Sequence, residues 1–234
     1  MTLAIFDLDN TLLGGDSDYL WGQYLVDQGI VDRTHYGAEN ERFYQEYVAG
    51  TMDIQEFLRF QLRPLTVHEP EQLRTWREDF LRRHIEPIVL PAAQTLLAEH
   101  RARGHTLLII TATNSFLTRP IADLLGVAHL LATEPQTHGG RYTGEVQGVP
   151  CYREGKVQRL QDWLRRHGAD LQGSWFYSDS HNDLPLLEQV TNPVAVDPDP
   201  QLRRVAQERE WPVISLRAGA QVSAGNEPDP PMDR

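Results

Sequence analysis

The sequence has one cysteine, no long apolar run and fewer basic than acidic residues. Because Cys151 stands alone among 234 residues, no intrachain disulfide and no cysteine-based zinc site can form, which fits a reducing compartment. The longest apolar runs, such as residues 107–110, are far too short to span a bilayer. The N-terminus has no basic segment and places Asp7 where a signal peptide would be apolar. We therefore expect a cytoplasmic protein that does not associate with membranes.

The shortage of basic residues also bears on whether the protein binds nucleic acids. The formal net charge is −11 at pH 7, from 33 acidic and 22 basic residues. Contacts with nucleic-acid phosphates need a basic face, so this charge disfavours DNA and RNA as partners. Basic pairs such as Arg82-Arg83 fall within helical patterns, where they more often form a solvated face than a recognition patch. The nine histidines show no paired ligand spacing, so we expect surface or packing roles for them.

The length and a hydrophobic content of 40% suit one α/β core with a smaller module. A first strand ends at Asp7, and the pattern from residue 14 to residue 90 is helical. We expect prolines, Pro64 among them, to punctuate these helices, because proline disrupts a helix interior. The predicted helices in this insertion cover residues 16–28, 42–49, 53–62 and 69–85.

After Pro91 the pattern alternates between strands and helices, which implies a parallel sheet with right-handed crossovers. We expect residues 1–13 and 91–216 to form the core, 14–90 a helical cap and 217–234 a disordered tail. The predicted strands are 106–111, 129–133, 174–178, 193–196 and 212–216, the predicted helices are 92–103, 116–125, 155–167 and 184–190, and residues 139–148 form a small hairpin.

Two carboxylates follow the first strand. Asp7 and Asp9 are two residues apart, so the period of a strand aims both side chains the same way. Like charges this close repel, and two ionised aspartates are tolerable mainly when a cation lies between them. A carboxylate pair that faces Mg²⁺ is the simplest interpretation. The alternative is a strand that enters an Asx-type turn, because Asp and Asn also serve turns.

Other polar residues follow later strands or begin a helix. In open α/β sheets, ligands bind beyond the carboxyl ends of the strands. Thr111 ends one strand, Asp179 and Asp183 follow another, and Lys156 lies at a helix start. Such groups offer hard oxygen ligands for a metal and a cation for a phosphate. Structural alternatives remain: Thr111 as a polar strand end, the two aspartates as helix caps, and Lys156 as a solvated lysine, although a cation at a helix start needs an anion nearby.

The motifs resemble those of the haloacid dehalogenase (HAD) superfamily, subfamily IB, the phosphoserine-phosphatase-like branch. Residues 7–11 look like its motif I, 109–111 like motif II, Lys156 like motif III and 179–183 like motif IV. Residues 140–145 are similar to the short hairpin that this family has between motifs II and III. The resemblance implies a Rossmann-like doubly wound parallel sheet with an inserted α-helical cap.

The resemblance also implies roles for single residues. Asp7 would attack phosphorus and form an aspartyl-phosphate, while Asp9 would protonate the departing alkoxide and later activate water. Mg²⁺ would be held by Asp7, Asp179 and the backbone carbonyl of Asp9, with Asp183 bound directly or through water. The phosphoryl oxygens would be bound at Thr111, Ala112, Lys156 and Asn182.

One position departs from the pattern of the phosphoserine-specific relatives. Where they have a cap glutamate that binds the substrate's amino group, this chain has Asp16, which is one methylene shorter. Asp16 would equally serve as a helix N-cap. The sequence does not single out a cap arginine for a substrate carboxylate among Arg42, Arg59, Arg63 and Arg77. Phosphoserine, histidinol phosphate and phosphoethanolamine-like amines therefore all stay open as substrates.

The leading hypothesis is a Mg²⁺-dependent phosphatase that acts on a small phosphorylated metabolite. A phosphotransferase or mutase could use the same site, and a non-catalytic binding protein could be built on the same fold. The intact set of Asp7, Asp9, Lys156 and Asp179 disfavours the non-catalytic alternative. Dehalogenation is disfavoured because a departing halide needs no proton from Asp9.

Overall fold

The computed structural model describes residues 2–217, and its centre is a parallel sheet. Within this range six strands follow the order β3-β2-β1-β6-β7-β8, and all five neighbouring pairs are parallel. The predicted α/β class with a doubly wound parallel sheet is confirmed. Residues 218–234 of the predicted tail lie outside the described residues. The strands are β1 (Leu3–Phe6), β2 (Thr106–Asn114), β3 (His129–Thr133), β6 (Trp175–Ser178), β7 (Asn192–Val196) and β8 (Val213–Ile214).

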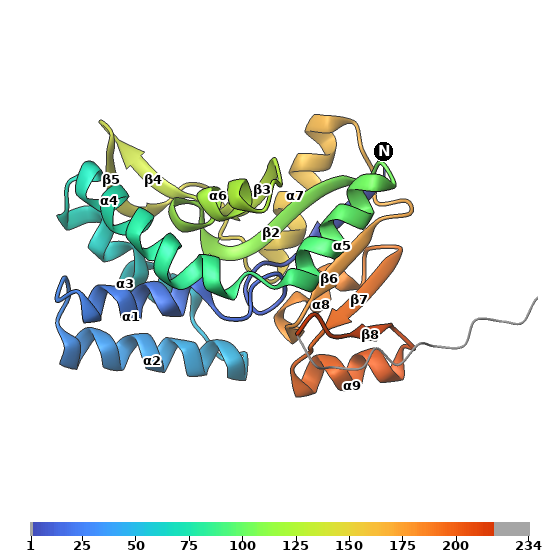
Figure 1. Ribbon diagram of the computed structural model, residues 1–234, viewed down its shortest axis with the longest axis horizontal. Helices are drawn as coiled ribbons and strands as arrows, with labels where there is room; N and C mark the ends of the chain where they lie inside the picture. Colours follow the sequence, from blue (N-terminus) through green and yellow to red (C-terminus); the bar gives the residue numbers. More distant parts are fainter. Residues whose placement is uncertain (1, 218–234) are drawn as a thin grey trace, which may run out of the picture.

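Helices cover both faces of this sheet, as the sequence of β1 requires. Ala4 and Phe6 belong to one buried hydrophobic cluster, and Leu3 and Ile5 belong to another. Because side chains alternate along a strand, each cluster lies on its own face of the sheet. One face is covered by α5 (Pro91–Ala102) and α6 (Ser115–Leu124), and the other by α7 (Glu154–His167), α8 (Leu184–Leu187) and α9 (Pro200–Glu208) (Figure 1).

Between β1 and α5 the chain is helical, and these helices lie together at the left of Figure 1. Asp16, Asp32 and Asp53 are the N-caps of the first three, and the side chain of each accepts hydrogen bonds from backbone N–H groups of the first turn. The segment contains α1 (Ser17–Asp27), α2 (Arg33–Ala49), α3 (Ile54–Val67), α4 (Pro70–Phe80), the π-helix η1 (Leu81–Ile85) and the 3-10 helix η2 (Glu86–Ile88).

A hairpin from the later part of the chain joins these helices. Strands β4 (Pro135–His138) and β5 (Arg141–Val146) pair antiparallel, and β5 packs against α3. Arg141 forms an ion pair with Glu69, which lies just before α4. The hairpin therefore extends the surface on which the inserted helices rest (Figure 1).

Several local features differ from the predictions. Pro64 does not end its helix, since α3 continues to Val67, and that prediction was wrong. The buried neighbours Leu62 and Leu65 hold the last turn in the core, which compensates for the hydrogen bond that proline cannot donate. Helix α2 begins well before residue 42, because Asp32 caps it. Helix α9 was not predicted, although Pro200 stands at its first position after a capping aspartate.

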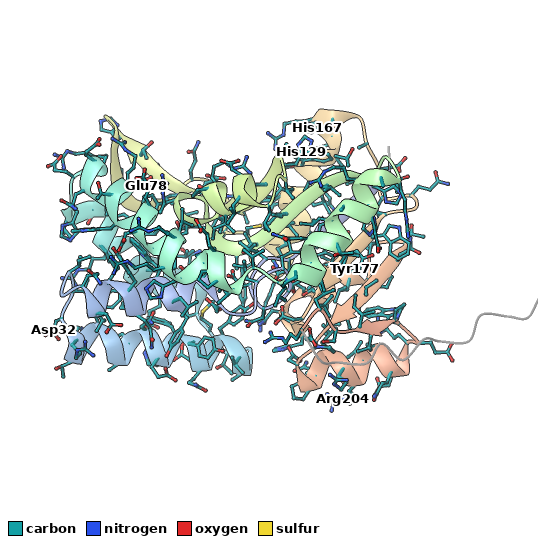
Figure 2. The ribbon with its side chains drawn as sticks, in the orientation of Figure 1. Asp32, Glu78, His129, His167, Tyr177 and Arg204 are labelled. Atoms are coloured by element: carbon teal, nitrogen blue, oxygen red, sulfur yellow. The ribbon has the colours of Figure 1, made fainter. Side chains whose placement is uncertain are left out.

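Several of the described histidines pack against other side chains. His100 is buried and lies 2.8 Å from the hydroxyl of Tyr177, which Figure 2 shows on the sheet beside α5. His129 and His167 lie side by side in Figure 2, with ring centroids 5.8 Å apart, and the ring of His167 stacks on Trp163. These contacts agree with the packing roles expected from the sequence.

Among residues 2–217, no helix has both the length and the apolar character needed to cross a membrane.

Two glycines allow a matched test of packing. A Cβ on Gly155, in the first turn of α7, would lie 2.0 Å from the carbonyl oxygen of Pro150. A Cβ on Gly37 in α2 would meet only a methyl group of Val26 at 4.0 Å. We expect Gly155→Ala to lower the free energy of unfolding by about 1–3 kcal/mol or more, because the backbone must move. Gly37→Ala should raise it by about 0.5–1 kcal/mol. Urea unfolding of both variants measures the difference, and equal stabilities would contradict the close approach at Gly155.

Candidate active site

The predicted site residues gather where the carboxyl ends of the central strands meet. Strand β1 lies between β2 and β6, so the chain winds away from it in both directions. Such a switch point leaves a crevice beyond the strand ends, where ligands bind. A pocket occupies this place, and Asp7, Asp9, Thr111 and Ala112 line its core side. Residues of the inserted helices line the other side.

A buried lysine joins two of the carboxylates. The Nζ atom of Lys156 lies 2.8 Å from Oδ1 of Asp7 and 2.7 Å and 2.8 Å from the two carboxylate oxygens of Asp183. Ser178 also donates a hydrogen bond to Asp183, at 2.7 Å. Burial opposes the charge of Lys156, but the two carboxylates outweigh burial and raise its pKa. The anions that a lysine at a helix start needs are therefore present.

The electrostatic balance around Asp7 remains negative. Burial raises the pKa of Asp7 to about 7; Lys156 opposes this shift, and the charges of Asp183 and Asp9 add to it. One lysine thus faces more than one carboxylate in a poorly solvated place. A further cation would stabilise this arrangement.

Asp9 is oriented by groups from both sides of the pocket. Its Oδ1 accepts a hydrogen bond from the backbone N–H of Ser17, the first residue of α1, at 2.7 Å. Its Oδ2 accepts one from the hydroxyl of Thr113 at 2.8 Å and a longer one from Thr111 at 3.4 Å. Thr113 was missed in the sequence, because the predicted strand ended at Thr111 whereas β2 continues to Asn114.

Asp179 has no basic partner among residues 2–217. Its Oδ1 accepts a hydrogen bond from the hydroxyl of Thr11 at 3.0 Å, and its own N–H donates to the same hydroxyl at 3.1 Å. Burial, followed by the charges of Asp7 and Asp183, raises the pKa of Asp179 well above its usual range. Asp179 is thus a second carboxylate at the strand ends that a cation would stabilise.

The oxygen donors around Asp7 and Asp179 fit Mg²⁺. Within the described part of the chain, no three His, Cys, Asp or Glu side chains form a group that could hold a metal by themselves. Mg²⁺ commonly uses only one or two carboxylates and keeps several waters. Asp7 and Asp179 with the backbone carbonyl of Asp9 would supply such a set, whereas both oxygens of Asp183 already face Lys156.

Asn182 connects the core to the inserted helices. Its Nδ2 donates to the carbonyl of Tyr47 in α2, and its Oδ1 accepts from the hydroxyl of Tyr152 and from Arg153. Arg153 donates a second hydrogen bond, at 2.6 Å, to the carbonyl of Gly50, which ends α2. The predicted phosphate ligand Asn182 is therefore engaged in docking α2 in this conformation, and its contact with a phosphoryl oxygen stays a prediction.

Gly50 has no room for a side chain at this junction. Its φ is +69°, in the left-handed region that favours glycine. A Cβ there would lie 2.4 Å from Nε2 of His181, whose Nδ1 lies 2.7 Å from Asp199. The backbone at the end of α2 thus lies directly against the side chain of His181 in the loop after β6.

The wall formed by the inserted helices is acidic and aromatic. Asp16 caps α1, with its Oδ1 accepting from the N–H groups of Asp18 and Tyr19 at 3.0 Å and 2.8 Å. Burial, with the charge of Asp9, raises the pKa of Asp16 to about 7. None of the four arginines considered from the sequence lines this pocket, and none of its lining residues is basic. The other residues of this wall are Asp18, Tyr19, Asn40, Phe43, Tyr44, Tyr47, Met52 and Phe57.

Sequence reasoning did not identify this wall, although a signal was present. Asn40, Phe43, Tyr44 and Tyr47 recur at the spacing of one helix face. The predicted helix begins only at residue 42 and α2 begins at Arg33, so the prediction did not include the whole face.

Comparisons with known proteins agree with this geometry. The family model of the haloacid dehalogenase-like hydrolases (HAD) matches residues 4–188. Over 219 residues the chain is 43% identical to a histidinol-phosphatase of Neisseria meningitidis serogroup C (strain 8013). The aligned residues cover 92% of this chain and 99% of that relative. The chain is 28% identical over 220 residues to the phosphoserine phosphatase SerB1 of Mycobacterium tuberculosis (strain ATCC 25618 / H37Rv), covering 92% of this chain and 70% of that one.

Solved structures show the same architecture. A protein of unknown function from Bordetella pertussis Tohama I is 44% identical, with a TM-score of 0.87, over 93% of this chain and 100% of that chain. A substrate-bound phosphoserine phosphatase is 16% identical, with a TM-score of 0.67, over 92% and 93% of the two chains, which shows the fold alone. The chain belongs to the haloacid dehalogenase-like hydrolases. The predicted family and the predicted enzyme class, a phosphatase of this family, are confirmed.

The raised pKa of Asp7 predicts how pH and metal affect stability. Because its pKa rises from 3.8 to about 7 on folding, the folded state binds more protons between these values. The contribution of Asp7 to the free energy of unfolding is therefore greatest below pH 3.8, and it is lost as the pH rises toward about 7. A divalent cation competes with that proton, so MgCl₂ should raise the melting temperature more at about pH 8 than at about pH 5. Calorimetry with EDTA as the reference measures both shifts.

A matched pair of variants separates the site from a general salt effect. Asp179→Asn should reduce the Mg²⁺-dependent rise at about pH 8, whereas the same change at the exposed Asp170 should leave it intact. An equal response to Mg²⁺ at both pH values in the unmodified protein would contradict a cation at Asp7.

Proposed function

We propose that the protein is a cytoplasmic, Mg²⁺-dependent phosphatase that hydrolyses a small phosphomonoester through an aspartyl-phosphate on Asp7. The observation that carries the proposal is the buried contact of 2.8 Å between Asp7 and Lys156, with Asp9 beside it. A carboxylate fixed by one oxygen to a lysine presents its other oxygen as a nucleophile. The lysine also supplies positive charge where phosphoryl oxygens gain negative charge.

The residues divide the reaction into two steps. In the first, an oxygen of Asp7 forms a bond to phosphorus, the ester P–O bond breaks, and Asp9 gives a proton to the departing alkoxide. In the second, Asp9 takes a proton from water as the water oxygen bonds to phosphorus, and Asp7 is released with inorganic phosphate. The hydrogen bonds from Ser17 and Thr113 hold the carboxyl group of Asp9 for both transfers. Asp7, Asp179 and the carbonyl of Asp9 would hold Mg²⁺, which would supply positive charge to neutralise part of the phosphoryl charge.

The pocket favours a cationic substrate without a carboxylate. Its lining includes four aspartates, at positions 7, 9, 16 and 18, and no basic residue. A phosphoserine carboxylate would face this acidic wall without a counter-charge, whereas an amine would be attracted to it. The relative that is 43% identical is named a histidinol-phosphatase. We therefore propose histidinol phosphate, or a closely similar amine-bearing phosphate, as the substrate, ahead of phosphoserine.

The nucleophile is tested by Asp7→Asn. The neutral amide cannot attack phosphorus, so release of inorganic phosphate from histidinol phosphate with MgCl₂ should fall below detection while the circular dichroism spectrum stays unchanged. Asp27→Asn, on the exposed end of α1, makes the same chemical change far from the pocket and should keep full turnover. Beryllium fluoride, which mimics a phosphoryl group, should bind at Asp7 in the unmodified enzyme. Turnover by Asp7→Asn near that of the unmodified enzyme would refute the assignment.

The role of Asp9 is tested by the leaving group. Asp9→Asn should lower kcat/KM on histidinol phosphate by about 10²–10⁴, the range for general acid catalysis. The loss on p-nitrophenyl phosphate should be smaller, because p-nitrophenolate leaves with little proton assistance. Equal losses on the two substrates would show that Asp9 serves geometry and not proton transfer.

A further inference from the structure

The pocket wall formed by α2 includes a tyrosine whose hydroxyl has no partner in the described part of the chain. Tyr47 lines the pocket together with Asp7 of the core. The hydroxyls of Tyr24, Tyr152 and Tyr177 each have a hydrogen-bond partner. Among residues 2–217, only the main-chain carbonyl of Tyr47 bonds to the core, and its hydroxyl forms no hydrogen bond. Tyr47 therefore offers a donor that a ligand in the pocket can use.

The charges that act on this hydroxyl indicate where it lies. Burial, followed by the charges of Asp7, Asp179 and Asp183, raises the pKa of Tyr47 well above its usual range. The effect of a charge falls with distance, so the hydroxyl lies near the strand ends that carry these three carboxylates. A phenol with a raised pKa keeps its proton and remains a donor at neutral pH. The side chain thus directs a protonated hydroxyl toward the proposed nucleophile.

The core holds this part of α2 in place from two sides. Nδ2 of Asn182 donates to the carbonyl of Tyr47 at 3.2 Å, and Arg153 donates to the carbonyl of Gly50 at 2.6 Å. The ring of Tyr47 lies near that of Tyr152, with centroids 6.3 Å apart. Arg153 makes its contact with a φ of +50°, a strained conformation of a kind that gathers at functional sites. A donor held in this way needs little rearrangement when charge develops on a substrate.

The other two tyrosines that line the pocket have different surroundings. The hydroxyl of Tyr19 donates to Glu41 at 2.8 Å. The ring of Tyr44 lies 4.6 Å from that of Tyr19, and burial, followed by the charges of Asp16 and Glu41, raises its pKa. Both hydroxyls therefore belong to the region around the start of α1. Of the tyrosines on this wall, Tyr47 is the one on which the charge of Asp7 acts most strongly among the neighbouring charges.

We propose that Tyr47 is a further phosphate-binding residue, whose hydroxyl donates a hydrogen bond to an oxygen of the phosphoryl group transferred to Asp7. The inference rests on the proposed function, because that function places the phosphoryl group at Asp7. Lys156 contacts Asp7 from the core, whereas Tyr47 belongs to the inserted helices, so the two parts of the molecule each supply a donor. The contact is with the phosphoryl group and not with the alcohol, so every phosphomonoester substrate should use it.

The test uses Tyr47→Phe, which removes the hydroxyl and keeps the ring that packs with Phe43 and Met52. Binding of inorganic phosphate, measured by calorimetry with MgCl₂, should weaken by about tenfold, as expected for the loss of a hydrogen bond to a charged group. The kcat/KM values for histidinol phosphate and p-nitrophenyl phosphate should fall by a similar factor, so that their ratio stays constant.

The matched control is Tyr36→Phe, the same change on the same helix at a tyrosine that lines a different hollow. It should leave phosphate binding and both kcat/KM values unaltered. Without phosphate, Tyr47→Phe should melt at the temperature of the unmodified protein, because the lost hydroxyl has no protein partner. Added phosphate should raise the melting temperature of Tyr47→Phe less than that of Tyr36→Phe.

The outcomes separate the inference from the proposed function. Unchanged phosphate affinity in Tyr47→Phe overturns the inference, and the ring of Tyr47 then only covers the pocket. A loss confined to histidinol phosphate also overturns it, because the hydroxyl would then contact the alcohol. If p-nitrophenyl phosphate is not hydrolysed with MgCl₂, the proposed function fails. Phosphate calorimetry then decides the inference by itself: weaker binding by Tyr47→Phe than by Tyr36→Phe supports it, and equal affinities or no binding overturn it.

Discussion

The structure depends on one buried lysine between two carboxylates. Lys156 comes from α7, Asp7 from the end of β1 and Asp183 from the loop after β6, so a single side chain ties together three distant parts of the sequence. Buried ions stabilise a fold only when their partners are well placed, and removal of one partner leaves an uncompensated charge. The contact that fixes the arrangement of the three segments therefore also holds one oxygen of Asp7, the proposed nucleophile. The lysine carries one positive charge and faces more than one carboxylate, so a further cation would stabilise the site.

The inserted helices do more than cover the pocket, because α1 also orients a carboxylate of the core. The first N–H of α1, from Ser17, holds one oxygen of Asp9, and Thr113 from β2 holds the other. The proposed general acid is thus oriented by both parts of the molecule at once. Any movement of α1 away from the core would change the orientation of Asp9 as well as open the pocket. Residues 9–18 therefore link the start of α1 directly to the carboxylate of the proposed general acid.

Much of the core could be predicted from the sequence, because its signals are local. The alternation of strands and helices after Pro91 and the polar residues at strand ends identified the sheet, Asp7, Asp9, Lys156 and Asp179 without knowledge of distant contacts. The acidic and aromatic wall was harder to predict. Gln61 lies on α3 and Asp18 on α1, and only the packing of these helices brings the two together. Pro64 shows the same limit, since buried neighbours override its local preference.

The docking of α2 on the core includes two hydrogen bonds to main-chain carbonyls of α2 and its C-cap. Asn182 binds the carbonyl of Tyr47 and Arg153 binds that of Gly50, while the ring of Tyr47 also packs near Tyr152 of the core. Gly50 must also lack a side chain, because a Cβ there would strike His181. Substitutions in α2 would leave these two main-chain hydrogen bonds in place, whereas the packing of Phe43 and Tyr47 near Tyr152 depends on the side chains. A fold joined in this way can acquire new substrates by substitution in its helical insertion, while the phosphate chemistry beneath it stays constant.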